Sequence, residues 1–290
     1  MSWKYRYACS ENDSIGSMMS FSDFAGCAKK AIRILAGAFF CVWQFFLISP
    51  AFAIETCTLR GPSETVKWDY IVDGDSLWLK DGRKVRFPSI NTPEIAHEKK
   101  PSEPYGDEAS LALKQLLSGT QKIRIQVVGK DHYGRVLAHP FLMDGRSIES
   151  LLIEKGLGYQ LFSEEPDVYR QCLKRKETEA RKEKIGVWSK NPVLDIKANG
   201  LKPGFRLFRG SVVEVESPKK SDFLWVEMDG PVVIRVPKFS LDAGWLKGLA
   251  GQRIEFRGWL VDRGEKNKGG RRYKRWMVGI YSRDGVQKLE

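Results

Sequence analysis

The chain has 290 residues, 42% of them hydrophobic, and its 48 Lys and Arg against 36 Asp and Glu give a net charge of +12. This length suits one or two domains with cores of ordinary size, and the composition excludes a disordered tail. Only one segment is apolar enough to enter a bilayer, which excludes a multi-span transporter. The five cysteines form no CxxC pair and the three histidines stand far apart, so a zinc site is not expected.

The first 53 residues are predicted to be an N-terminal extension with a secretory signal peptide. Three basic residues within 29–33 precede an uncharged apolar run over 34–48, which leads into Ser-Pro-Ala-Phe-Ala at 49–53. These are the three parts of such a signal, so we expect cleavage after Ala53 and export to the periplasm or the medium. At about 1.5 Å per residue the run spans about 22 Å, short of a bilayer core of about 30 Å. The alternative is an uncleaved membrane anchor at 34–48.

Two cysteines remain after this segment, Cys57 and Cys172, in 237 residues with a net charge of +10. In an oxidising compartment such a pair invites a disulfide. The sequence leaves open whether the two side chains meet.

The charge divides the remaining chain into two predicted domains. Residues 54–199 carry 24 basic and 22 acidic side chains, whereas residues 200–290 carry 19 and 11, a net of +8. The boundary falls near 190–203, where Asn-Pro, Asn-Gly and Lys-Pro-Gly interrupt the periodic pattern. Most of the positive excess therefore belongs to the smaller C-terminal domain.

The first domain is predicted to contain five strands and three helices. Asp81-Gly82 is typical of a hairpin turn, and Gly119 and Gly156 follow helical patterns that they would end. His139 falls inside a predicted strand, where we expect a structural role. The fold class is α+β, mostly β, with a closed five-stranded barrel of the oligonucleotide-binding (OB) type. The predicted strands are 66–72, 76–80, 84–90, 122–128 and 135–142, and the helices are 107–117, 147–155 and 167–184.

The second domain is nearly all strand by the same criteria, and we expect a second small OB-like barrel. A segment at 263–275 has seven basic residues and three glycines, and Trp259, Tyr273 and Trp276 flank it. Cationic loops beside aromatic rings bind single-stranded nucleic acid in such barrels, while the alternative is a solvated hairpin beside core tryptophans. The predicted strands are 207–216, 223–228, 232–236, 253–261 and 276–281.

Four short motifs of the first domain form a group because of their order and spacing. They are Val72-Asp73-Gly74-Asp75-Ser76, Val85-Arg86-Phe87-Pro88-Ser89-Ile90-Asn91-Thr92-Pro93-Glu94, Tyr105-Gly106-Asp107-Glu108-Ala109-Ser110 and Asp131-His132-Tyr133-Gly134-Arg135. Within a barrel pattern, this group resembles the thermonuclease (staphylococcal-nuclease-like) family over about residues 64–189. The second domain resembles, more loosely, the small barrel-like tail of some bacterial members.

The residue types also suit the cleavage of a phosphodiester bond, which needs a poised water, neutralised phosphate charge and a stabilised leaving oxygen. Arg86 and Arg135 carry permanent charges that bind phosphate oxygens bidentately. Glu94 can orient or deprotonate the water as a general base. Asp75 offers an oxygen to a hard cation such as calcium.

The resemblance implies calcium-dependent hydrolysis of DNA and RNA that leaves 3′-phosphate ends, and it implies roles for eight residues. Those matching the catalytic positions are Arg86, Glu94 and Arg135. Those matching metal-binding positions are Asp75, Asn91 and, through its backbone carbonyl, Thr92. Those matching substrate-contacting positions are Tyr133 and Phe162.

Two departures from the family pattern bear on this site. Asn91 stands where the family usually has a second metal-binding aspartate, so the calcium site loses one negative charge and affinity is expected to fall. Pro88-Ser89 replaces the usual apolar residue and glycine, which changes the approach of the chain to Glu94.

Three functions remain open. The leading hypothesis is an exported, metal-dependent nuclease of low sequence specificity that acts on DNA, RNA or both. Its rival is a nucleic-acid-binding protein that kept the barrel but lost its metal, which Asn91 favours. The third is an envelope scaffold held by an uncleaved anchor, with its basic domain on anionic lipid.

Overall fold

The computed structural model describes residues 57–97, 100–163, 167–264, 267–268 and 271–289, which belong to one compact unit. The predicted signal peptide, its cleavage site after Ala53 and the alternative anchor at 34–48 lie outside these residues. Within the described ranges, no helix is long and apolar enough to cross a membrane.

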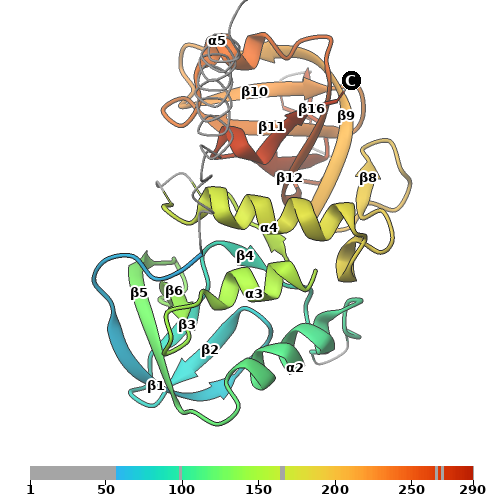
Figure 1. Ribbon diagram of the computed structural model, residues 1–290. Helices are drawn as coiled ribbons and strands as arrows, with labels where there is room; N and C mark the ends of the chain where they lie inside the picture. Colours follow the sequence, from blue (N-terminus) through green and yellow to red (C-terminus); the bar gives the residue numbers. More distant parts are fainter. Residues whose placement is uncertain (1–56, 98–99, 164–166, 265–266, 269–270, 290) are drawn as a thin grey trace, which may run out of the picture. The chain divides into compact units, whose positions relative to one another are not determined.

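Five strands of the first half close into a barrel in the order β1-β2-β3-β6-β5 (Figure 1). Neighbouring strands are antiparallel except β3 and β6, which run parallel with Val85 opposite Val136. The predicted turn at Asp81-Gly82 is confirmed, because Gly82 joins β2 to β3 with a φ of 88°. The strands are β1 (Glu64–Ile71), β2 (Ser76–Leu79), β3 (Lys84–Arg86), β5 (Lys122–Lys130) and β6 (Val136–Phe141).

The predicted single strand over 84–90 is wrong. β3 ends at Arg86, the chain bends through Pro88 and Ser89, and a short strand β4 (Ile90–Asn91) then pairs with β7 (Tyr159–Gln160) outside the barrel. Pro88 has no N–H for a ladder bond, and the Arg86 side chain binds the carbonyls of the bend. The bend therefore carries the Asn91 segment away from the barrel wall.

All three predicted helices of this half are present. Ser147 caps the second of them, where its Oγ accepts a hydrogen bond from Ser150 N at 3.2 Å. The third is shorter than the predicted 167–184, because Asp167 lies before it and its Oδ1 accepts a hydrogen bond from Tyr169 N at 2.7 Å. The helices are α2 (Gly106–Leu116), α3 (Ile148–Glu154) and α4 (Arg170–Lys182), followed by a 3-10 turn η1 (Gly186–Trp188).

A disulfide joins Cys57 to Cys172, which are 115 positions apart in sequence and have their Cα atoms 5.7 Å apart. It ties the segment before β1 to α4. Both cysteines belong to the hydrophobic core of the first barrel, which also packs α2, α3 and α4 on its strands. The pairing that the sequence left open is therefore present in the structure.

A second ring of five strands forms in the C-terminal half and has its own hydrophobic core. Each strand pairs with the next in the order β9-β10-β11-β15-β12, and β12 pairs with β9 to close the ring. Only β11 and β15 are parallel within this ring, so the third strand lies beside the fifth, as in the first barrel. The predicted fold class of two successive OB-like barrels is confirmed. The five strands are β9 (Gly204–Glu216), β10 (Phe223–Met228), β11 (Val232–Pro237), β12 (Arg253–Asp262) and β15 (Trp276–Gly279).

Several short elements of this half have no counterpart among the predicted ones. β8 pairs with β9 although it precedes residue 200, where the predicted second domain begins; that boundary stays a prediction. The additional elements are β8 (Val193–Asp195), α5 (Ala243–Lys247), β13 (Asn267–Lys268), β14 (Arg271–Arg272), η2 (Arg283–Gly285) and β16 (Val286–Lys288).

Candidate active site

The turn between β1 and β2 brings Asp75 against the segment that follows the bend. Asp75 is only 4% exposed. Its Oδ2 accepts a hydrogen bond from Thr92 N at 2.7 Å, and its Oδ1 lies 3.1 Å from Arg86 Nη1. Gly74 is required at this turn, because a Cβ there would lie 2.7 Å from Ala109 Cβ and 2.8 Å from Thr92 Oγ1. Segments far apart in sequence thus meet around one buried carboxylate.

Arg86 is buried and holds the bend in place. Its Nη1 donates to the carbonyl oxygens of Phe87 at 2.7 Å and Ile90 at 2.9 Å. Its Nη2 donates to Asn91 Oδ1 at 3.3 Å. The guanidinium therefore organises the bend as well as carrying a positive charge into the site.

Glu94 lies three residues beyond Asn91, with its side chain exposed. Desolvation of its carboxylate by the surrounding chain, followed by the negative charges of Asp75 and Glu103, raises the pKa of Glu94, while the positive charges of Arg86 and Arg135 act in the opposite direction. Its backbone is held on both sides by Glu103, whose N donates to Glu94 O at 2.8 Å and whose Oε2 accepts from Glu94 N at 3.3 Å.

The start of α2 supports this segment from the other side. A Cβ at Gly106 would lie 2.4 Å from the carbonyl oxygen of Glu94, so only glycine permits this approach. Tyr105, immediately before it, adopts a φ of 72°. The sequence motif Tyr105-Gly106 therefore serves to bring the helix onto the backbone of Glu94.

Arg135 and Tyr133 come from the turn between β5 and β6. Asp131 Oδ1 accepts hydrogen bonds from the backbone N of both residues at 2.9 Å, and its Oδ2 accepts from Arg135 Nε at 2.7 Å. The Tyr133 ring is 75% exposed, and the Arg135 guanidinium lies 5.6 Å from its centroid. The turn thus presents a guanidinium and an aromatic ring to solvent.

The oxygen atoms around Asp75 make a donor set that fits a hard cation. Asp75 supplies a carboxylate, Asn91 an amide oxygen and Thr92 a backbone carbonyl, which accepts a hydrogen bond from Asn91 Nδ2 at 3.3 Å. Burial and the neighbouring charge of Asp75 raise the pKa of Asp73 to about 7, so Asp73 is partly protonated near neutral pH and adds little negative charge. Among the described residues, no group of three His, Cys, Asp or Glu side chains has the arrangement of a metal site. The fit therefore rests on neutral oxygens beside one carboxylate.

Phe162 is placed apart from the other predicted site residues. It follows β7 and faces the second barrel, where the Arg257 guanidinium lies 5.3 Å from its ring centroid. It lines a small groove of about 230 Å³ with Trp259 and Tyr281. Pro88 of the bend lines the same groove.

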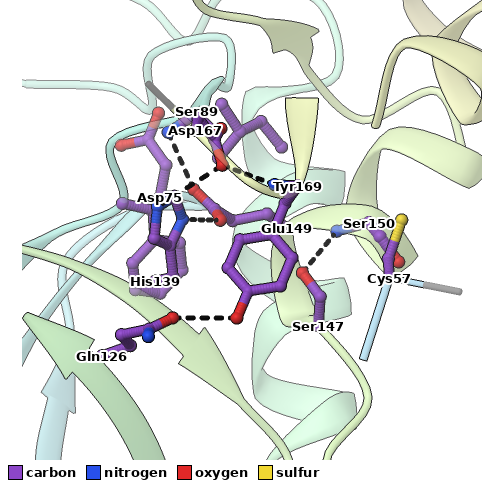
Figure 2. Close-up of polar contacts among 12 residues, drawn as sticks. Cys57, Asp75, Ser89, Gln126, His139, Ser147, Glu149, Ser150, Asp167 and Tyr169 are labelled. Atoms are coloured by element: carbon purple, nitrogen blue, oxygen red, sulfur yellow. Dashed lines mark hydrogen bonds and ion pairs between the residues drawn. The ribbon is translucent and has the colours of Figure 1, made fainter. Parts of the chain in front are cut away.

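A buried polar cluster lies behind the bend (Figure 2). Glu149 of α3 is fully buried; its Oε1 accepts from Ser89 N at 2.8 Å, and its Oε2 lies 2.7 Å from His139 Nδ1. Ser89 Oγ donates to Asp167 Oδ2 at 2.6 Å. Burial acts to lower the pKa of His139, but the charge and hydrogen bond of Glu149 and the charge of Asp167 outweigh it and raise the pKa. Ser89, which departs from the family pattern, is therefore held by two carboxyl side chains, through its backbone N and its Oγ.

Sequence reasoning missed Asp73, Glu103 and the contacts of this cluster, although the structural role expected for His139 agrees with its burial beside Glu149. The first carboxylate of the Asp-Gly-Asp turn was a usable signal for Asp73. A histidine at a buried strand position and a glutamate in the first turn of a helix were weak signals for His139 and Glu149. Glu103 had none, because only the folded chain places it beside Glu94.

Comparison with known proteins shows which family this sequence resembles. The family model described as "Staphylococcal nuclease homologue" matches residues 84–190. The chain is 35% identical over 142 residues to the SPbeta prophage-derived endonuclease YokF of Bacillus subtilis, covering 47% of this chain and 48% of that protein. It is 31% identical over 154 residues to Thermonuclease of Staphylococcus intermedius, covering 51% and 89%, and 33% identical over 132 residues to Endonuclease YncB of Bacillus subtilis, covering 43% and 62%.

The match thus spans about half the length of YokF but most of the shorter thermonuclease. The matched segment includes the bend, the Glu94 segment, the Tyr105-Gly106 motif and the turn that carries Arg135. The resemblance that the motifs indicated is confirmed: this chain belongs to the staphylococcal nuclease family.

Proposed function

We propose that this protein is a nuclease that hydrolyses phosphodiester bonds of DNA, RNA or both with low sequence specificity. Glu94 is the general base, and Arg86 and Arg135 are the phosphate clamps. The observation that carries the proposal is the set of contacts that joins the Asp75 carboxylate to Arg86 and to the backbone of Thr92, two residues before Glu94. In this setting the pKa of Glu94 is raised. A carboxyl with a raised pKa is a better proton acceptor near neutral pH. Membership of a nuclease family supports the same class of hydrolase.

In the proposed reaction, a water held by Glu94 attacks the phosphorus atom while Glu94 takes its proton. A bond forms between the water oxygen and phosphorus, the bond to the leaving ester oxygen breaks, and that oxygen takes a proton from solvent water. The negative charge that builds on the phosphoryl oxygens is offset by Arg86 and Arg135. Arg86 is held rigidly by the bend, whereas Arg135 is about a third exposed and suits contact with an incoming strand.

The residues that would hold a calcium ion are Asp75, Asn91 through Oδ1 and Thr92 through its carbonyl. Such an ion supplies positive charge to the phosphate and lowers the pKa of a bound water. Asn91 contributes no negative charge, so we propose a weaker calcium site than one with two aspartates would form.

We also propose that the protein is exported. The apolar run at 34–48 and the small-x-small end at 49–53 support this, and so does the Cys57–Cys172 disulfide, because disulfides persist in oxidising compartments. N-terminal sequencing of the mature protein tests it. A first residue of Ile54 agrees with the proposal, and an uncleaved chain in the membrane fraction favours the anchor.

The hydrolytic function is tested by digestion of single- and double-stranded DNA and of RNA, with calcium and with a chelator. Wild type is compared with Glu94→Gln, and Glu179→Gln, an exposed carboxylate of α4, serves as the matched control. We expect the wild type and the control to digest nucleic acid in calcium only. Glu94→Gln should lower the turnover rate by about 100- to 10,000-fold while binding is retained.

The rival function is a nucleic-acid-binding protein without hydrolytic activity, which Asn91 favours. It predicts that wild type shifts DNA and RNA on a gel but leaves them intact at every calcium concentration. That outcome would refute the nuclease proposal. If Glu94→Gln is as active as wild type, only the role assigned to Glu94 is refuted, and the nuclease proposal stands.

A further inference from the structure

The second barrel lies outside the segment that matches the nuclease family model, which ends at residue 190. Its strand order is that of an OB fold, in which the outer face of the second and third strands and two flanking loops bind oligonucleotides. In this barrel those strands are β10 and β11. The flanking residues are 217–222, on one side, and Arg263 and Tyr273 from the connection between β12 and β15, on the other.

A groove of about 560 Å³ lies on this face. Trp225 and Glu227 of β10 and Val233 of β11 line it, together with Arg263 and Tyr273 from the β12–β15 connection. The strand residues between them, among them Leu224 and Val226, are buried in the core of the barrel. The alternation along β10 therefore turns its large aromatic side chains outward.

Aromatic rings and guanidinium groups alternate along this face. The Arg263 guanidinium lies 5.5 Å from the Trp225 ring centroid and 5.6 Å from that of Tyr273. The Arg235 guanidinium lies 4.6 Å from the Phe223 ring, and the rings of Phe223 and Trp225 are 6.4 Å apart. Bases stack on aromatic rings and on guanidinium planes alike, and the same guanidinium groups attract phosphate.

The groove carries charges of both signs, and its Arg263 lies beside the aromatic rings of Trp225 and Tyr273. Glu227 lies 3.1 Å from Lys274 Nζ, so its charge is compensated. Glu214 and Glu216 line the β9 side, where they repel phosphate. Among the described residues, no carboxylate forms an ion pair with Arg235 or Arg263. Residues 200–290 have a net charge of +8, which favours a polyanion.

We propose that the outer face of β10 and β11, with Arg263 and Tyr273, is a second nucleic-acid-binding site that takes an unpaired strand without sequence specificity. This goes beyond the hydrolytic site, since it requires neither Glu94 nor a metal ion. Unpaired bases are needed because a duplex hides the base faces that stack on Trp225 and Phe223.

The site differs from the one that the sequence indicated around 263–275. Tyr273 belongs to it, but Trp276 packs in the core of the barrel, and Trp259 packs against Phe205 with their ring centroids 5.1 Å apart. Trp225 takes their place. Trp225 belongs to strand β10 and not to the basic segment 263–275.

The test measures fluorescence anisotropy of a labelled oligothymidylate of about 15 nucleotides, a length suited to one OB fold. The full mature chain is used with a chelator, so that no hydrolysis competes. Trp225→Ala combined with Arg263→Gln is expected to weaken binding by about 5- to 100-fold, and Trp225→Phe should restore most of it. The matched control is Trp78→Ala, which removes an exposed tryptophan of the first barrel that also carries a cation, Lys84, at 4.7 Å.

Hydrolysis of a minimal phosphodiester, too short to reach the second barrel, separates this proposal from the first. The double variant should cleave it at the wild-type rate and should melt at the wild-type temperature. The proposal is overturned if the folded double variant binds oligothymidylate as tightly as wild type. It is also overturned if Trp78→Ala weakens binding to the same extent, or if wild type prefers duplex to single strand.

Discussion

The substitution Glu149→Gln is expected to destabilise the protein most at mildly acidic pH. It removes the charge that faces His139 but keeps the size of the side chain and an oxygen that can accept from Ser89 N. Removing one partner of a buried ion pair costs about 3–5 kcal/mol. Because Asp167 stays 3.9 Å from His139 Nε2, we expect the lower end, about 3 kcal/mol.

The pH dependence follows from the raised pKa of His139. Burial lowers this pKa, but Glu149 and Asp167 together overcome burial, so the folded protein holds the proton more tightly than the unfolded chain, whose ordinary value is 6.5. The stabilisation is therefore complete below pH 6.5 and is lost as the pH rises through the folded-state pKa. Glu149→Gln should flatten this part of the stability profile, because most of the upward influence on the pKa is gone.

Urea unfolding followed by tryptophan fluorescence measures both effects, at about pH 6 and at about pH 8. The control is Glu154→Gln on the same helix, whose carboxylate pairs with Lys176 at 2.8 Å at the surface. Glu154→Gln should lower the free energy of unfolding by less than about 1 kcal/mol at either pH. The predicted role of Glu149 is refuted if Glu149→Gln lowers the free energy of unfolding no more than Glu154→Gln does. It is also refuted if the free energy of unfolding changes between about pH 6 and about pH 8 by the same amount in Glu149→Gln as in wild type.

Three further outcomes are expected. Arg86→Lys should lower turnover by about 100-fold in the digestion assay, because one ammonium cannot both bind the carbonyls of the bend and clamp a phosphate; wild-type turnover would contradict this. Replacing Cys57 and Cys172 by serine should lower the free energy of unfolding in urea by about 2–5 kcal/mol, and adding reductant to the variant should change nothing further. Arg257→Gln leaves the buried Glu177 carboxylate without its 2.7 Å partner and should cost about 3–5 kcal/mol in the same assay, whereas a loss under about 1 kcal/mol would show that the pair is solvated.

The predicted site residues were found from motif order, and the folded chain brings part of the set into direct contact. Asp75, Arg86, Asn91 and Thr92 are joined by hydrogen bonds and an ion pair. Glu94 interacts with this group through the charges of Asp75 and Arg86, which act on its pKa. Phe162 is not part of this group, and its environment could not be foreseen, because the second barrel that covers it is formed by residues about a hundred positions later.

Local chemistry in the sequence was sufficient for most of the barrel strands, the three helices of the first barrel, the Asp81-Gly82 turn and the family. Alternating hydrophobicity, helix-ending glycines and turn residues act over a few positions, so they can be recognised without knowing the fold. The charge difference between the two halves is likewise a property of composition.

Contacts between distant segments decided the rest. The strand predicted at 84–90 is interrupted where the Arg86 side chain donates hydrogen bonds to the carbonyls of the bend. The second ring closes because β12 pairs with β9. Glu149 and His139 are ten positions apart, yet only the packing of α3 on β6 makes them a buried pair. Ionisable groups interact through the space that folding creates, so their pKa values and their function belong to the tertiary structure.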